Sequence, residues 1–208
     1  MMIKLRAVLP GDIEKKSFEI ITRELGDKKL DPEQEPVIKR VIHTTADFDY
    51  ADNLVFSEGA VRRISDAIRR GACIVTDTQM AWAGINKKKL REYGGEAYCF
   101  MADEDVAARA EREGTTRAAA GMKKAANLAG PLIFAVGNAP TALVQLYRMG
   151  RAQGFKPEGI IGVPVGFVNV VESKELIMQT GVPYIVAKGR KGGSNVAAAI
   201  VNAVLYRL

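Results

Sequence analysis

The sequence predicts one α/β domain, a three-layer α/β/α sandwich around a mainly parallel five-stranded sheet. Three observations predict this fold class: five short apolar runs, a longer helical stretch after each run, and no strict polar alternation within the runs. With 208 residues and 48% hydrophobic content, the chain can bury the core of a single domain spanning residues 1–208.

The first third of the chain is predicted to be helical. The run Asp31-Pro32-Glu33 combines a capping residue, a proline suited to the first turn and an acid, so a helix is expected over 33–43. The run Ser57-Glu58-Gly59-Ala60 begins another helix, which is expected to end at Gly71.

From residue 72 onward, predicted strands and helices alternate. The apolar runs predict strands at 72–76, 97–100, 132–136, 160–163 and 184–187. Helices are predicted at about 86–92, 104–112, 115–129, 141–152, 172–180 and 194–206. Buried parallel strands joined by helices in this way form a sheet that is covered on both faces.

The charge of the chain favours an anionic partner. The formal net charge is +6, from 30 Lys and Arg against 24 Asp and Glu. A nucleic acid is disfavoured, because only 7% of residues are aromatic and the basic residues are interspersed with acids instead of forming a stripe. A small polyanionic metabolite accounts for the same excess.

The sequence argues against a membrane partner and against a metal or nucleotide cofactor. No apolar run approaches the roughly 18 residues that cross a bilayer, and no signal-peptide core follows the first residues, so a cytoplasmic protein is expected. Cys73 and Cys99 lack C-x-x-C spacing, and one histidine cannot complete the usual zinc site. Neither the Walker motif nor the dinucleotide fingerprint occurs.

His43 is the only histidine, so any imidazole chemistry must take place there. If 33–43 is a helix, its apolar side carries Val37, Ile38, Val41 and Ile42, and His43 lies on the opposite side with Lys39 and Arg40. An imidazole can give or take a proton near neutral pH. The alternative is a solvated surface histidine without a catalytic role.

Three segments that follow predicted strands are suited to binding anions. In an α/β sandwich, ligands bind outside the carboxyl ends of the strands. These segments are 137–141, a glycine turn leading into a proline-started helix; 164–174, with Glu172-Ser173-Lys174 at its end; and 188–194, which is basic and rich in glycine. Glycines that only serve tight turns are the alternative. Asp77 also follows a strand and is predicted first to cap the next helix, with a polar wall of the active site as the alternative.

These stretches together resemble the precorrin-8X methylmutase family of cobalamin biosynthesis, nearly from end to end. The resemblance rests on the motifs Lys16-Ser17-Phe18-Glu19-Ile20-Ile21, Arg40-Val41-Ile42-His43, Asp77-Thr78-Gln79-Met80, Gly114-Thr115-Thr116-Arg117, Gly137-Asn138-Ala139-Pro140-Thr141, Gly162-Val163-Pro164-Val165-Gly166-Phe167-Val168, Glu172-Ser173-Lys174 and Gly189-Arg190-Lys191-Gly192-Gly193-Ser194. It implies a flavodoxin-like fold, a homodimer, and an isomerase that moves a methyl group from carbon 11 to carbon 12 of a corrinoid precursor without an external methyl donor.

The resemblance also implies which residues act. His43 matches the family's proton donor or acceptor, and Ser17 and Arg40 fall on substrate-contacting positions. Further pocket positions are matched by Arg117, Gly137, Asn138, Ala139 and Thr141. We expect Arg190 and Lys191 of the basic loop to bind carboxylates of the polycarboxylate corrinoid. The rival hypotheses are a non-catalytic tetrapyrrole carrier and, ranked last, a nucleic-acid-binding module.

Overall fold

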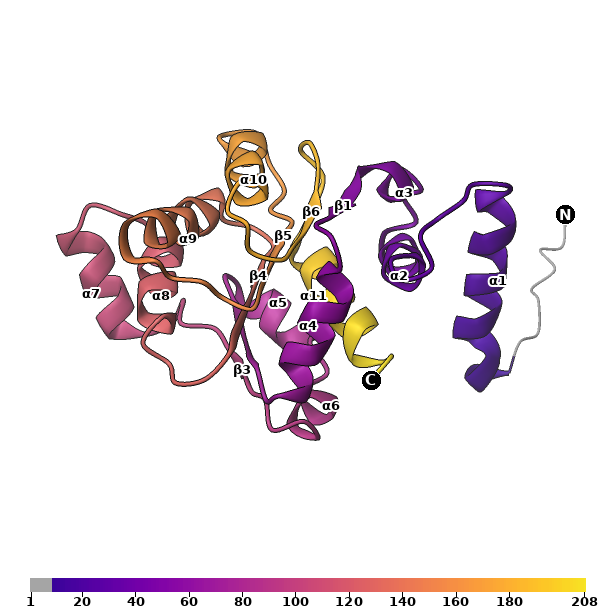
Figure 1. Ribbon diagram of the computed structural model, residues 1–208, viewed down its shortest axis with the longest axis horizontal. Helices are drawn as coiled ribbons and strands as arrows, with labels where there is room; N and C mark the ends of the chain where they lie inside the picture. Colours follow the sequence, from indigo (N-terminus) through magenta and orange to yellow (C-terminus); the bar gives the residue numbers. More distant parts are fainter. Residues whose placement is uncertain (1–8) are drawn as a thin grey trace, which may run out of the picture.

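The computed structural model describes residues 9–208, in which a six-stranded sheet lies between two layers of helices (Figure 1). Its strands are β1 (Leu54–Phe56), β2 (Cys73–Thr76), β3 (Ala97–Tyr98), β4 (Leu132–Val136), β5 (Gly159–Gly162) and β6 (Tyr184–Ala187). They follow the order β1-β6-β5-β4-β2-β3. β1 pairs antiparallel with β6, and all other neighbours pair in parallel.

The predicted strand count was wrong by one. Each of the five apolar runs forms a strand, but β1 was missed because it is only three residues long and follows a short helix directly. Leu54 pairs with Ala187 at the edge of the sheet. Without β1, the remaining strands have the order 2-1-3-4-5 in their own numbering, which is the order of flavodoxin-like sheets.

The helices agree closely with the ranges predicted for them, although α1, α3 and α5 had no predicted range. They are α1 (Ile13–Leu25), α2 (Glu35–Thr45), α3 (Tyr50–Asn53), α4 (Ala60–Arg69), α5 (Gln79–Gly84), α6 (Lys87–Arg91), α7 (Glu104–Arg112), α8 (Arg117–Ala125), α9 (Pro140–Gln153), α10 (Val170–Met178) and α11 (Ser194–Leu205). A 3-10 turn, Pro10–Asp12, precedes α1. None of the helices within residues 9–208 is long and apolar enough to cross a membrane.

Alternate residues of the central strands face the two helical layers. Ile74, Ile133 and Ile161 join the core formed with α2, α4 and α11, whereas Val75 and Phe134 join the core formed with α8, α9 and α10. Both faces of the strands are apolar because both are covered, which explains why the runs showed no polar alternation.

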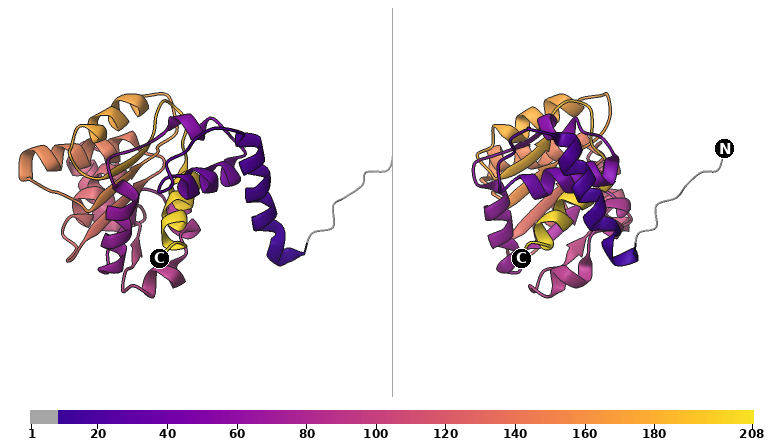
Figure 2. Two further views of the ribbon diagram at one scale, coloured as in Figure 1. Left: turned by 45° about the vertical axis from the view of Figure 1, so that its right-hand side comes forward. Right: turned by 90° about the vertical axis from the view of Figure 1, so that its right-hand side faces the viewer.

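α1 lies outside this sandwich. It packs against α2, on the side of α2 that faces away from the sheet (Figures 1 and 2). Of its side chains only Ile21 is buried, and Ile13 remains 56% exposed. The helix therefore forms an additional outer layer beside α2 and contributes little to the central core.

The topological switch point lies between β2 and β4. The chain leaves β2 toward α5, which packs with α11 on one face of the sheet, and leaves β4 toward α9 on the other face. Loops that diverge in this way leave a crevice at the carboxyl ends of the strands, where ligands of such folds bind. The segments that follow β5 and β6 begin at the same edge.

Candidate active site

His43 and Ser17 meet where α1 packs against α2. Val37, Ile38, Val41 and Ile42 of α2 are buried, so His43 lies on the outer face of the helix as its periodicity predicted. The hydroxyl oxygen of Ser17 lies 2.7 Å from Nδ1 of His43, and the ring of Phe18 lies 5.4 Å from the imidazole, between centroids. Among residues 9–208, no hydrogen bond engages Nε2, which is therefore the nitrogen available to a ligand.

Arg40 lies one turn from His43 and is held on three sides. Its guanidinium pairs with Glu14 at 2.5 Å and lies 5.0 Å and 5.1 Å from the ring centroids of Phe18 and Tyr206. Only 17% of its side chain is exposed. The neighbouring Lys39 pairs with Glu35. The cations around His43 are thus already matched by carboxylates from α1 and α2.

Asp77 does not cap α5, and this corrects the prediction. Thr78 is the cap, since its side chain accepts a hydrogen bond from the amide of Ala81. The carboxylate of Asp77, 1% exposed, instead accepts hydrogen bonds from the amides of Gly137, Asn138 and Ala139 at 2.8, 2.8 and 2.6 Å. Burial raises the pKa of Asp77, while these hydrogen bonds act in the opposite direction.

The loop 137–141 therefore does not offer a ligand the amides that its sequence suggested. An anion does occupy the expected place at the start of α9, but that anion is a carboxylate of the protein. Gly137 also approaches the backbone of Ser194 closely. A Cβ atom on Gly137 would lie 2.7 Å from the Cα of Ser194. The glycine thus permits close packing of two loops at the switch point.

Replacing Asp77 by Asn should destabilise the protein. An amide offers one acceptor oxygen where the carboxylate offers two, and each buried amide left unsatisfied costs about 1–3 kcal/mol. We expect the midpoint of thermal unfolding to fall by several degrees. Asp66→Asn is the matched control, because Asp66 makes an exposed pair with Arg69 and should contribute less than about 1 kcal/mol. Equal unfolding midpoints for Asp77→Asn and the wild type would show that the carboxylate does not hold the loop.

Arg117 and Thr141 are brought together at the same edge of the sheet. The hydroxyl of Thr141 lies 2.7 Å from that of Thr116, which caps α8, and Arg117 is the first residue of that helix. Among residues 9–208, the Arg117 side chain forms no ion pair. It is exposed and can meet an anionic ligand without first losing a partner.

In the basic loop after β6, the cations of Arg190 and Lys191 are in different situations. The ammonium of Lys191 lies 2.6 Å from a carboxylate oxygen of both Asp47 and Asp49, and these hydrogen bonds raise its pKa. Arg190 makes no ion pair within the described chain, and its guanidinium lies 5.4 Å from the centroid of the Phe167 ring. Lys191 is therefore already paired with carboxylates of the protein, whereas the guanidinium of Arg190 can pair with an anionic ligand.

The predicted site residues thus form two groups. Ser17, Arg40 and His43 lie where α1 meets α2, whereas the others surround the carboxyl edge of the sheet: Arg117, Gly137, Asn138, Ala139, Thr141, Arg190 and Lys191. The ion pair of Lys191 with Asp47 connects the groups, because Asp47 follows α2 by two residues.

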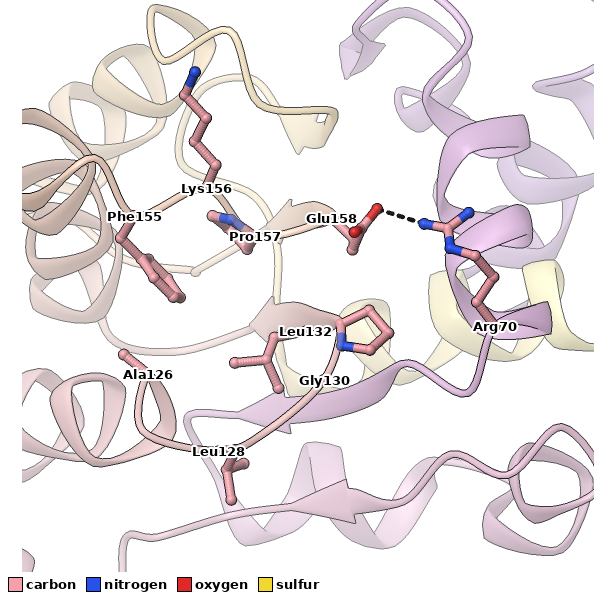
Figure 3. Close-up of a pocket in the computed structure, with 10 residues that line it drawn as sticks. Arg70, Ala126, Leu128, Gly130, Leu132, Phe155, Lys156, Pro157 and Glu158 are labelled. Carbon is pink, nitrogen blue, oxygen red and sulfur yellow. Dashed lines mark hydrogen bonds and ion pairs between the residues drawn. The ribbon is translucent and has the colours of Figure 1, made fainter.

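A separate cavity lies at the opposite end of the sheet (Figure 3). It has a volume of about 530 Å³ and is lined by the start of β4, the segment before β5 and the end of α4. Its Arg70 and Glu158 side chains pair at 2.7 Å. None of the predicted site residues lines it.

Known proteins resemble this chain over nearly its whole length. The family model described as precorrin-8X methylmutase matches residues 12–207. The cobalt-precorrin-8 methylmutase of Priestia megaterium is 46% identical over 197 residues, covering 95% of this chain and 88% of that protein. The enzyme of the same name from Salmonella typhimurium is 46% identical over 205 residues, with 96% of each chain covered.

A solved structure shows the same fold. The crystal structure of a precorrin-8X methylmutase from Thermus thermophilus matches with a TM-score of 0.85 and 41% sequence identity, covering 94% of this chain and 96% of that chain.

Proposed function

Because this chain belongs to the precorrin-8X methylmutase family, which comprises isomerases of cobalamin biosynthesis, we propose that it moves a methyl group from carbon 11 to carbon 12 of precorrin-8X or cobalt-precorrin-8. The product would be hydrogenobyrinate or its cobalt-containing counterpart, cobyrinate. One carbon–methyl bond breaks and another forms within the same molecule, so the formula is unchanged and no methyl donor is consumed.

His43 is proposed as the proton donor or acceptor for this shift. The observation that carries the proposal is the 2.7 Å contact between the Ser17 hydroxyl and Nδ1 of the only histidine in the chain. A hydrogen bond to one ring nitrogen fixes the orientation of the imidazole and directs the other nitrogen toward the reacting molecule. In this scheme Nε2 exchanges the proton with the macrocycle and recovers its original state after the methyl group has moved.

Ser17 would then act first on His43 and only second on the substrate. The resemblance assigned Ser17 to substrate contact, but a hydroxyl has one proton to donate and two lone pairs. If a protonated Nδ1 donates to the Ser17 oxygen, the hydroxyl proton is left to donate to a carboxylate or ring substituent of a bound corrinoid. The contact with His43 supports a role in orienting the imidazole.

The carboxylates of the macrocycle are proposed to meet the cations of the carboxyl edge. Arg117 and Arg190 can bind them directly, because no ion pair within residues 9–208 has to be broken. Arg40 would have to exchange Glu14 for a substrate carboxylate. A guanidinium presents parallel N–H groups that match a carboxylate, which favours these arginines as receptors.

A homodimer remains part of the proposal. α1 carries Ser17, yet within the described chain it packs mainly on α2. Ile13 at its start is 56% exposed, and Leu9, just before the 3-10 turn, is 72% exposed. A second copy of the chain could cover this side of α1. Sedimentation in solution tests this: a species of twice 22.6 kDa is expected, and the single-chain mass alone would contradict it.

Turnover with excess substrate separates an enzyme from a carrier. The protein is mixed with many equivalents of enzymatically prepared precorrin-8, with and without cobalt, and the visible spectrum is followed to its end point. An isomerase converts all of the substrate. A non-catalytic carrier binds one equivalent of corrinoid per site, and the spectrum then changes no further. That result would overturn the proposal.

A further inference from the structure

Lys174 is a buried lysine that the proposed reaction does not use. It lies on the inward face of α10 with Val170, Ser173 and Ile177, and it is 1% exposed. No carboxylate within residues 9–208 pairs with its ammonium, and burial lowers the pKa of Lys174 to about 8. Burying an ammonium without a counter-ion costs free energy, and the hydrogen bonds that the ammonium makes must offset that cost.

Those hydrogen bonds hold the basic loop after β6. The ammonium of Lys174 donates to the carbonyl oxygens of Gly189 and Lys191, both at 2.8 Å. The carbonyl between them, that of Arg190, accepts a hydrogen bond from the amide of Gly166 at 3.1 Å. Three consecutive carbonyls are thereby fixed. The side chain of Lys174 holds those of Gly189 and Lys191, and the loop after β5 holds that of Arg190.

The glycines on either side complete this arrangement. Gly189 has φ +75°, and a Cβ atom on Gly192 would lie 2.1 Å from the carbonyl oxygen of Val163. The amide of Gly193 donates to the same oxygen at 2.9 Å. The loop therefore lies directly on the chain that leaves β5, and side chains are excluded where the two segments meet.

Arg190 extends from the centre of this fixed backbone. Its guanidinium lies 5.4 Å from the ring of Phe167, which is 81% exposed on the loop after β5. Lys191, the next residue, is held by Asp47 and Asp49. Arg190 is thus an unpaired cation whose backbone is anchored on both sides and whose guanidinium lies beside an aromatic ring.

We propose that Lys174 is a positioning residue, which holds the carbonyls of Gly189 and Lys191 so that Arg190 is preorganised to receive a carboxylate of the macrocycle. This inference rests on the proposed function, because it takes a polycarboxylate corrinoid as the ligand. Preorganisation strengthens binding by removing the cost of ordering the loop and the arginine when the ligand arrives. Lys174 itself does not touch the ligand.

A double-mutant cycle tests the coupling of the two residues. The dissociation constant for hydrogenobyrinate is measured from the visible band for the wild type, Lys174→Met, Arg190→Ala and the double variant. Arg190→Ala should weaken binding by about tenfold to a hundredfold. Lys174→Met should weaken it by roughly threefold to tenfold, and the double variant should match Arg190→Ala alone.

The values of KM and kcat distinguish a positioning role of Lys174 from a general loss of folded structure. Lys174→Met should raise KM while leaving kcat near the wild-type value, because the histidine stands on α2 and not on the loop. Methionine has a similar volume but leaves the carbonyls of Gly189 and Lys191 without this donor, so the thermal unfolding midpoint of each variant is measured beside its kinetic constants. Lys174→Gln enters the same cycle as a second truncation, so that one poorly folding variant does not decide the outcome.

Three results would overturn the inference without touching the proposed function. These are wild-type affinity in a folded Lys174 variant, an additive loss in the double variant, and a fall in kcat at unchanged affinity. The last result would mean that Lys174 acts on the histidine of α2 and not on Arg190, through its contact with Lys191 and the pairing of Lys191 with Asp47. Failure of the wild type itself to bind or convert the corrinoid would instead reject the proposed function.

Discussion

Replacing His43 by alanine should lower turnover by about 10²–10⁴-fold while leaving the fold intact. A general acid or base typically contributes a factor of this size, and the chain has no second imidazole to take over. His43 is exposed on the outer face of α2, so its removal leaves the buried face of the helix unchanged. The measurement is kcat with precorrin-8 as substrate, alongside the thermal unfolding midpoint.

Thr44→Ala is the matched control for this variant. Thr44 is the next residue on α2, is also exposed, and bonds only to the carbonyl of Arg40 within its own helix. It should retain turnover close to that of the wild type. If His43→Ala also retained such turnover in a folded protein, the imidazole would have no part in the reaction.

Replacing Arg40 by alanine should weaken binding of the corrinoid product by about tenfold to a hundredfold. A sheltered, charge-assisted hydrogen bond to a carboxylate contributes roughly 1.5–3 kcal/mol, and only 17% of the Arg40 side chain is exposed. Titration with hydrogenobyrinate at two salt concentrations measures the effect. The exposed Lys88 serves as the surface control, and Lys88→Ala should hardly change the affinity.

Glu14→Ala tests a different explanation of the same loss. Arg40 pairs with Glu14 and so could act only by holding α1 against α2. If that were its role, Glu14→Ala would weaken product binding as much as Arg40→Ala does. If Arg40 binds a carboxylate of the ligand, Glu14→Ala should leave the affinity unchanged or improve it, because it removes the competing anion.

The continuous apolar runs of the sequence predicted most of the sheet, because buried parallel strands are apolar on both faces. Residues 132–136 and 184–187 were predicted with the bounds that β4 and β6 have. β1 escaped detection because three residues are too few to show a period, and its pairing with β6 joins segments far apart in the sequence. Sheet edges of this kind depend on tertiary contacts.

The candidate site was harder to predict because charges can be counted in a sequence but their pairings cannot. Lys191 contacts Asp47 across 144 positions, and Asp77 reaches the amide of Gly137 across 60. One local signal was available for Lys174, whose spacing from Val170 and Ile177 places it on the apolar face of α10. A lysine at such a position indicates a buried ammonium with a specific partner.

The fate of the migrating methyl group tests the central claim most directly. Precorrin-8 carrying an isotopic label in its carbon 11 methyl group is converted without S-adenosylmethionine, and nuclear magnetic resonance locates the label in the product. The proposed reaction requires the full label on carbon 12, with no loss to solvent or to other molecules. A label that remains on carbon 11 in tightly bound corrinoid would contradict the proposed isomerisation and show that the protein only carries its ligand.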